Sequence, residues 1–297
     1  MNTEENTKFK SGDYMKKGLV LEGGAMRGLF SAGVMDVMME NNIKFDGAIG
    51  VSAGACFGCN YKSEQIGRAI RYNLKYSRDK RYCSFYSLIT TGDLYGADFC
   101  YREIPEELDI FDKDAFNKNP MKFYTVCSDI ETGEAVYTLM DTNNDNYLDW
   151  IRASASMPLV SRIVEIDGGK YLDGGMTDSV PLKQFQKMGY EKNIVILTQP
   201  KDYVKKPNKA LWLIKMTLKK YPKIIEAIKN RHIVYNQTTD YIKKQEDAGN
   251  ALVICPSESL PIKRIENDPE KLKLVYNEGR RIATEQLPKI KEFLEQR

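Results

Sequence analysis

The stretch 18–55 constrains the fold most, because it contains two consecutive strand, turn and helix units. The apolar run 18–21 has the length of a buried strand, and the pair Gly23-Gly24 favours a tight turn. Apolar residues then recur at helical spacing over 29–38, and residues 48–60 repeat the same layout. The pattern predicts an α/β fold in which neighbouring strands run parallel.

The second turn, Gly50-Val51-Ser52-Ala53-Gly54, has the G-x-S-x-G pattern of a nucleophile elbow. In this motif the glycines permit a sharp bend that exposes the serine hydroxyl, and the N-terminus of the following helix directs partial positive charge at it. Ser52 is therefore a candidate nucleophile, supported by Gly50 and Gly54. A buried serine in a glycine-rich turn is the alternative interpretation of this pattern alone.

The first turn can supply an oxyanion hole for such a serine. Parallel strands bring their carboxyl-end turns to one edge of a sheet, so we expect the amides of Gly24, Ala25 and Met26 near the Ser52 hydroxyl. Loss of one oxyanion donor typically lowers an enzyme's rate by about 10²–10³. A dinucleotide-binding loop is disfavoured, because Ala25 stands where that loop needs its second glycine and no acidic residue ends a second strand.

The length and composition fit a globular chain with a sizeable core. At 297 residues and 42% hydrophobic content, it can form one large or two modest domains. We expect a flexible N-terminal tail over 1–17, a catalytic core over 18–200 and a mainly helical portion over 201–297 packed on the same domain. The tail lacks the apolar segment of a signal peptide, and no window holds 18 consecutive apolar residues. A cytoplasmic protein is the default expectation.

The cysteines and acidic residues do not form a metal-binding pattern. The six cysteines lack the density of a disulfide scaffold, so reduced thiols are expected. Cys56 and Cys59 form a C-x-x-C, but there is no second pair and only one histidine to complete a zinc site. The acidic run 141–145 fails as a calcium loop, because Asn146 replaces the required glycine and Arg152 the final acid. No metal, other cofactor or nucleic acid is expected.

The segment 201–231 is predicted to be helical and strongly basic. It holds ten Lys or Arg against two acids, a net charge of +8, whereas the whole chain carries +3. Apolar residues alternate with the basic ones, which suits either a solvated helix packed on the body or a helix lying on an anionic membrane. Each basic residue near anionic lipid contributes about 1 kcal/mol, so part of this cluster could dock the protein reversibly.

The single histidine, His232, restricts how Ser52 can be activated. A Ser-His-Asp triad needs a histidine near the serine, but His232 continues an apolar helical face away from any strand-end turn. A carboxylate can take the serine proton instead when burial raises its pKa. Asp173, at a strand end before Gly174-Gly175, is the best-placed acid. A plain Asp-Gly turn is the alternative interpretation of this stretch.

Taken together, the motifs resemble the patatin-like phospholipase family. The three matching blocks, in order, are Gly23-Gly24-Ala25-Met26-Arg27-Gly28, Gly50-Val51-Ser52-Ala53-Gly54 and Asp173-Gly174-Gly175. The alanine-serine-proline segment 153–158 is also similar to the family, and the resemblance spans roughly 18–197. The ordered combination is far more specific than any single block.

The resemblance implies a three-layer α/β/α sandwich with a mostly parallel central sheet and a serine-aspartate dyad that cleaves lipid acyl esters without a metal. In that mechanism Ser52 attacks the carbonyl carbon, Asp173 takes the serine proton and later activates water, and the loop 23–28 forms the oxyanion hole. Arg27 would brace this loop by pairing with backbone or a carboxylate. Ala25 replaces the usual third glycine, and its methyl group could narrow the hole.

The leading expectation is therefore hydrolysis of phospholipids or related lipid esters, with peripheral contact to anionic membranes through Lys201–Arg231. One alternative is a short-chain carboxylesterase or thioesterase whose pocket admits no membrane lipid. Another is a membrane-associated patatin-fold adaptor with little turnover, although the intact Ser52 and Asp173 argue against it. The sequence leaves the head group, the acyl chain and the oligomeric state open.

Overall fold

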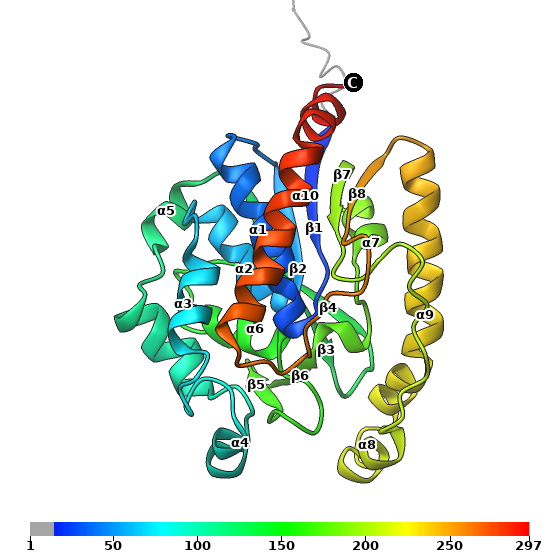
Figure 1. The fold of residues 1–297 in the computed structure, drawn as a ribbon. Coiled ribbons are helices and arrows are strands. Elements are labelled where there is room, and N and C mark those ends of the chain that lie inside the picture. Colours follow the sequence, from blue (N-terminus) through cyan, green and yellow to red (C-terminus); the bar gives the residue numbers. More distant parts are fainter. Residues whose placement is uncertain (1–14, 297) are drawn as a thin grey trace, which may run out of the picture.

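The computed structural model describes residues 15–296, which form a mixed sheet covered by helices on both faces (Figure 1). Within this range the eight strands follow the order β5-β6-β3-β2-β1-β7-β8, and β4 pairs with β3 outside that order. The parallel strands are β1 (Lys16–Leu21), β2 (Gly47–Val51), β3 (Lys122–Asp129), β7 (Tyr190–Ile196) and β8 (Ala251–Ile254). The antiparallel strands are β4 (Ala135–Leu139), β5 (Val164–Ile166) and β6 (Gly169–Asp173). The predicted mostly parallel α/β/α sandwich is confirmed.

The side chains of β1 show why both faces of the sheet are covered. Successive side chains of a strand point to opposite faces. Leu19 and Leu21 belong to the apolar core shared with one set of helices, whereas Val20 belongs to the core on the other face. The first set includes α1 (Gly28–Glu40), α2 (Ala53–Lys62) and α10 (Pro269–Glu295), and the second α7 (Leu182–Lys187) and α9 (Pro222–Asp247). Because both faces of the sheet are buried over residues 18–21, this part of β1 has no polar face, whereas Lys16 at the start of the strand is exposed.

The final helix packs directly on the first one, as Figure 1 shows for α10 and α1. Two glycines permit this close approach. A Cβ atom at Gly279 would overlap the carbonyl oxygen of Phe30, and one at Gly33 would overlap the carbonyl oxygen of Tyr276. The helical C-terminal portion is therefore part of the same packed core as the N-terminal half.

The remaining helical elements are shorter. They are α3 (Arg68–Tyr76), α4 (Phe85–Thr91), α5 (Lys113–Lys118), α6 (Tyr147–Ser154), α8 (Leu211–Thr217), the π-helical segment η2 (Phe99–Leu108) and the 3-10 turns η1 (Ala25–Arg27) and η3 (Gly174–Met176). The sequence did not predict η2. The strand β1 begins at Lys16, inside the predicted tail 1–17, and the rest of that prediction, residues 1–14, lies outside the described residues.

The basic segment 201–231, predicted to be helical, is helical only in part. Residues 201–210 follow an irregular path, α8 ends at Thr217, and α9 begins at Pro222. Pro207 and Pro222 favour the interruptions, because proline lacks an amide hydrogen and is best tolerated in the first turn of a helix. Among the helices that the structure describes, none combines the length and apolar character needed to cross a membrane.

Candidate active site

Two strand ends bring Ser52 and Asp173 together. On β3, Val126 pairs with the last residue of β2, and the next residue, Cys127, pairs with the last residue of β6. Because β6 runs antiparallel to β2, the two strands end head to head against β3. Ser52 and Asp173 therefore meet, and a hydrogen bond from the Ser52 side chain acts to lower the pKa of the Asp173 carboxyl.

Ser52 occupies the strained turn that the G-x-S-x-G pattern predicts. Its φ of 55° and ψ of −123° lie in a region that non-glycine residues rarely adopt. The two glycines are required sterically: a Cβ at Gly54 would lie 2.5 Å from the carbonyl oxygen of Leu21, and one at Gly50 would overlap the Gly54 carbonyl oxygen. The serine hydroxyl is thus held at the start of α2.

The glycine-rich loop lies against this serine, as the parallel arrangement of β1 and β2 predicts. A Cβ at Gly23 would stand 2.8 Å from the Ser52 Cβ, so only glycine permits this contact. Gly24 is equally confined, since a Cβ there would lie 2.6 Å from the Thr198 hydroxyl. The amides of Gly23 and Gly24 donate no hydrogen bond to any residue in 15–296. They are free to bind an oxyanion.

The rest of the loop places one unusual residue next to the serine. Ala25 adopts a φ of 50°, in the left-handed region that favours glycine. Met26 is buried and lines an apolar cavity. A Cβ at Gly28 would lie 2.7 Å from the Ala53 Cβ, which explains why α1 begins with glycine beside α2.

The segment 153–158 joins the serine turn to the acid, a role that the sequence did not reveal. The backbone amide of Ser52 donates to the Ser154 hydroxyl at 2.9 Å, and this hydroxyl donates to the Val126 carbonyl oxygen at 2.7 Å. The Asp173 amide donates to the Ser156 carbonyl oxygen at 2.8 Å. The alanine-serine-proline pattern was the only sequence signal for these residues, and it does not say what they contact.

Asp173 is buried and its environment acts on its pKa in both directions. Burial raises the pKa of the carboxyl above its ordinary value, and this effect prevails. Three groups oppose this rise in the pKa: the Ser52 hydroxyl, the charge of Arg231 and the Gly175 amide. The Gly175 amide donates to Asp173 Oδ1 at 2.7 Å. A Cβ at Gly174 would overlap the Val126 carbonyl oxygen, so the pair Gly174-Gly175 lets the chain turn close to β3. A carboxylate with a raised pKa is suited to accept a proton.

Arg27 does not brace the loop as expected. Its Nε is buried without a hydrogen-bond partner, and within residues 15–296 it forms no ion pair with a carboxylate. Burial lowers the pKa of the guanidinium, and the nearby charge of Glu22 partly offsets this effect. The side chain instead lines a polar cavity beside Ser52.

Two cavities of opposite character meet at Ser52. The first is apolar and extends from the serine between α2, η2 and α6; its lining includes Phe57, Tyr72, Tyr101, Phe111, Leu148 and Ile151. The second is polar and is lined by Glu22, Arg27, Asp173, Lys205, Arg231 and Arg264, among others. Ser52, Ala25 and Met157 line both. An amphipathic molecule could therefore place its apolar and polar parts on opposite sides of the serine.

The C-x-x-C cysteines belong to the apolar cavity. Burial raises the pKa of Cys56 to about 12 and that of Cys59 to about 11, so both thiols are neutral at physiological pH. Across residues 15–296, no three His, Cys, Asp or Glu side chains lie close enough to hold a metal ion. The two cysteines serve here as small apolar lining residues.

His232 lies outside both cavities. It is on α9, and its Nδ1 is 3.1 Å from the carbonyl oxygen of Lys229 one turn earlier. We expect His232→Gln to change the hydrolytic rate by less than about twofold, because the ring touches neither Ser52 nor Asp173. Initial-rate measurements on a soluble ester check this, and a loss of about 10³ in a folded variant would instead indicate a triad.

Comparison with known proteins identifies the family. Residues 19–185 match the family model described as patatin-like phospholipase, and residues 221–295 match a domain of unknown function (DUF6363). The chain is 28% identical to the uncharacterized protein YjjU of Escherichia coli (strain K12), over 82% of this chain and 69% of that protein. It is 24% identical to the probable lipid hydrolase 463L of Invertebrate iridescent virus 6, over 60% of this chain and 66% of that protein. Both relatives are thus matched over about two thirds of their length.

A more distant likeness exists among solved structures. VipD from Legionella pneumophila shares 12% identity with a TM-score of 0.45, over 93% of this chain and 67% of that chain. The present structure has a three-layer α/β fold with a serine at a strand-to-helix turn. The chain belongs to the patatin-like phospholipase family, because the family model covers more than half of its residues. This membership supports lipid acyl hydrolase activity.

Proposed function

We propose that this enzyme cleaves carboxylic esters of lipids with a Ser52–Asp173 dyad and without a metal ion. The observation that carries the proposal is the position of Ser52, beside a buried acid and at the junction of an apolar and a charged cavity. A lipid ester has this division, with an acyl chain on one side of the carbonyl and a polar alcohol on the other. The apolar cavity would hold the acyl chain.

The reaction would proceed through an acyl-enzyme. The Ser52 oxygen attacks the ester carbonyl carbon while its proton passes to the Asp173 carboxylate. Collapse of the tetrahedral intermediate breaks the bond to the alcohol oxygen, and Asp173 returns the proton to that oxygen. Asp173 then takes a proton from water, whose oxygen attacks the acyl carbon. As the bond between the acyl carbon and the Ser52 oxygen breaks and the fatty acid leaves, Asp173 returns this proton to the Ser52 oxygen.

The free amides at the serine would stabilise the intermediate. Gly23 and Gly24 lie against Ser52 with unused backbone donors. Their position at the start of η1 adds the partial positive charge of a helical turn to an oxyanion formed there. The methyl group of Ala25, which lines both cavities, would limit the space around this oxyanion.

Fatty acid release tests this function directly. Purified enzyme is mixed with phospholipid vesicles and, separately, with soluble p-nitrophenyl esters of short acids. Release from the vesicles that exceeds the Ser52→Ala background supports a lipid hydrolase. Turnover of the short esters alone would favour the short-chain esterase or thioesterase, and vesicle binding without turnover would favour the adaptor.

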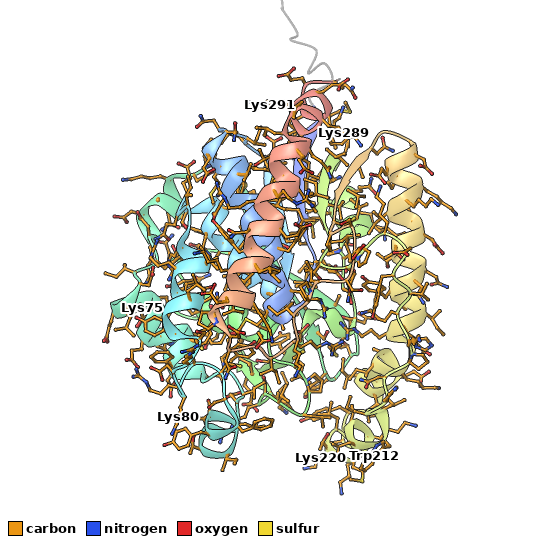
Figure 2. The ribbon with its side chains drawn as sticks, viewed as in Figure 1. Lys75, Lys80, Trp212, Lys220, Lys289 and Lys291 are labelled. Atoms are coloured by element: carbon orange, nitrogen blue, oxygen red, sulfur yellow. The ribbon has the colours of Figure 1, made fainter. Side chains whose placement is uncertain are left out.

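The enzyme also presents a surface that we propose contacts anionic membranes. Two short helices, α4 and α8, protrude at the end of the molecule toward which the parallel strands run (Figure 1). Ile89 on α4 is 84% exposed and Trp212 on α8 is 64% exposed, unusual values for large apolar side chains. Trp212 and Lys220 lie together at this tip (Figure 2). Such a mixture of aromatic and basic side chains suits the interface of an anionic bilayer.

Charge reversal tests this membrane contact. The double variant Lys215→Glu/Lys219→Glu should weaken binding to phosphatidylserine vesicles by about tenfold or more, since each lysine near anionic lipid contributes about 1 kcal/mol. Vesicle sedimentation at low salt measures the effect. The matched control is Lys289→Glu/Lys291→Glu, at the opposite end of the molecule (Figure 2). Equal binding of both variants would mean that α8 is only a solvated surface.

A further inference from the structure

The polar cavity beside Ser52 carries an excess of positive charge. Arg27, Lys205, Arg231 and Arg264 line it, against the carboxyl groups of Glu22 and Asp173. The Nε atoms of Arg27 and Arg231 are buried without any hydrogen-bond partner. Buried charged groups are normally paired, so this arrangement is costly unless an anion occupies the cavity.

The two acids do not neutralise these cations by direct pairing. Glu22 accepts hydrogen bonds from the Thr198 amide at 2.6 Å and the Tyr235 hydroxyl at 2.8 Å, which hold its carboxylate in place. Within the described chain, none of the four basic side chains forms an ion pair with a carboxylate. Arg231 donates to the Ser179 hydroxyl at 3.5 Å, at the limit of a hydrogen bond.

The cations are held in the cavity by separate parts of the fold. Lys205 lies on the irregular segment 201–210, which is held against α9 by Asn236. The backbone amide of Lys205 donates to Asn236 Oδ1 at 2.9 Å, and Asn236 Nδ2 donates to the carbonyl oxygen of Lys205 at 3.1 Å. The Lys205 ammonium lies 4.0 Å from the centre of the Tyr235 ring. Arg231 projects from α9 beside η3, where a Cβ at Gly175 would be 3.0 Å from its guanidinium.

Most of this cluster comes from outside the patatin-like match, and Arg231 and Arg264 lie within the match to the domain of unknown function. Only Arg27 lies within residues 19–185, whereas Lys205, Arg231 and Arg264 belong to the C-terminal portion. The C-terminal portion therefore contributes three basic side chains to the polar cavity, whereas Ser52 and Asp173 come from the part of the chain that matches the family model.

We propose that this cavity binds the phosphate of a phospholipid substrate while the acyl chain occupies the apolar cavity. The inference rests on the proposed ester hydrolysis and names its substrate class. In a glycerophospholipid the phosphate is only a few bonds from the ester oxygen, which suits a cavity that shares Ser52 with the acyl cavity. Arginine recognises phosphate through paired, charge-assisted hydrogen bonds, and lysine adds a point charge.

Substrate preference tests the proposal. The readout is the ratio of kcat/KM on a phosphatidylglycerol to kcat/KM on a diacylglycerol with the same acyl chains, both in mixed micelles of neutral detergent. Lys205→Met and Arg231→Gln should each lower this ratio by about tenfold or more, as expected for loss of a charged phosphate contact. Lys206→Met is the matched control, because Lys206 is exposed next to Lys205 and does not line the cavity.

The pH dependence of the ratio provides a second readout. The pKa of Lys205 is lowered to about 7, chiefly by burial and to a smaller extent by the positive charges of Arg231, Arg264 and Arg27. The negative charge of Glu22 acts in the opposite direction. The rings of Tyr203 and Tyr235 also lie close to the Lys205 ammonium. Lys205 is therefore charged below about pH 7 and neutral above it. The preference for phospholipid should be larger at pH 6 than at pH 8.5, and Lys205→Met should reduce this difference.

The outcomes separate this proposal from the proposed function. If wild-type enzyme cleaves neither lipid, ester hydrolysis itself is wrong. If both lipids are cleaved and the variants leave the ratio unchanged, or reduce both rates equally, the phosphate site is wrong. An unchanged ratio combined with thermal stabilisation of the wild type by inorganic phosphate, absent in Arg231→Gln, would assign the cavity to free phosphate and overturn the lipid assignment.

Discussion

Ser52→Ala is expected to lower hydrolysis of every ester substrate by about 10⁵-fold or more, because the variant has no oxygen to form the acyl-enzyme. The backbone at this position has a φ of 55°, and alanine is no bulkier than serine, so the turn should persist. The measurement is the initial rate of fatty acid or p-nitrophenol release. The residual rate would come from the oxyanion donors and substrate binding alone.

The matched control is Ser31→Ala. Ser31 is a buried serine on α1 whose hydroxyl has no hydrogen-bond partner, so its loss should leave both the rate and the melting temperature close to those of the wild type. Near-normal turnover in a folded Ser52→Ala enzyme would show that another residue forms the covalent intermediate. Failure to trap an acyl-enzyme on Ser52 in the wild type would point the same way.

Asp173→Asn is expected to lower the rate by about 10⁴-fold, because an amide cannot accept the serine proton. In the wild type the Gly175 amide donates a hydrogen bond to Asp173 Oδ1 at 2.7 Å. The side-chain oxygen of asparagine can accept the same hydrogen bond. The loop should therefore keep its conformation. Asp178→Asn is the control, since Asp178 is another acid near η3 that bonds the Tyr137 hydroxyl and lies outside the cavities at Ser52. Equal losses in both variants would argue for a structural effect.

The acid limb of the pH profile reports on the same carboxyl. The carboxylate is the reactive form, so the rate on a soluble ester should fall as the pH falls through the pKa of Asp173, which burial raises above the ordinary aspartate value. Arg231 opposes this rise through its charge. Arg231→Gln should therefore move the acid limb to higher pH. An unchanged acid limb would show that the charge of Arg231 does not affect the pKa of Asp173, the proposed catalytic carboxyl.

The local elements and the candidates for the reactive groups followed from the sequence. Apolar runs and glycine pairs predicted the strand-to-helix units, because side-chain periodicity and backbone freedom are properties of neighbouring residues. The segment 201–231, predicted to be helical, is interrupted near Pro207 and Pro222, where the effect of proline on the backbone outweighs the amphipathic pattern. The scarcity of histidine correctly directed attention to Asp173 as the acid near Ser52, and its catalytic role stays a prediction.

What the sequence by itself determined is the set of parts: a mostly parallel sheet, a serine in a strained turn and free amides in a glycine-rich loop. The tertiary structure decided how they meet, because β3 pairs with both β2 and β6 and so places two distant strand ends at adjacent positions. It alone revealed Ser154 as the bridge to the serine amide and gathered Lys205 and Arg231 beside Arg27. Contacts between residues far apart in the chain depend on sheet pairing and helix packing, which no local pattern encodes.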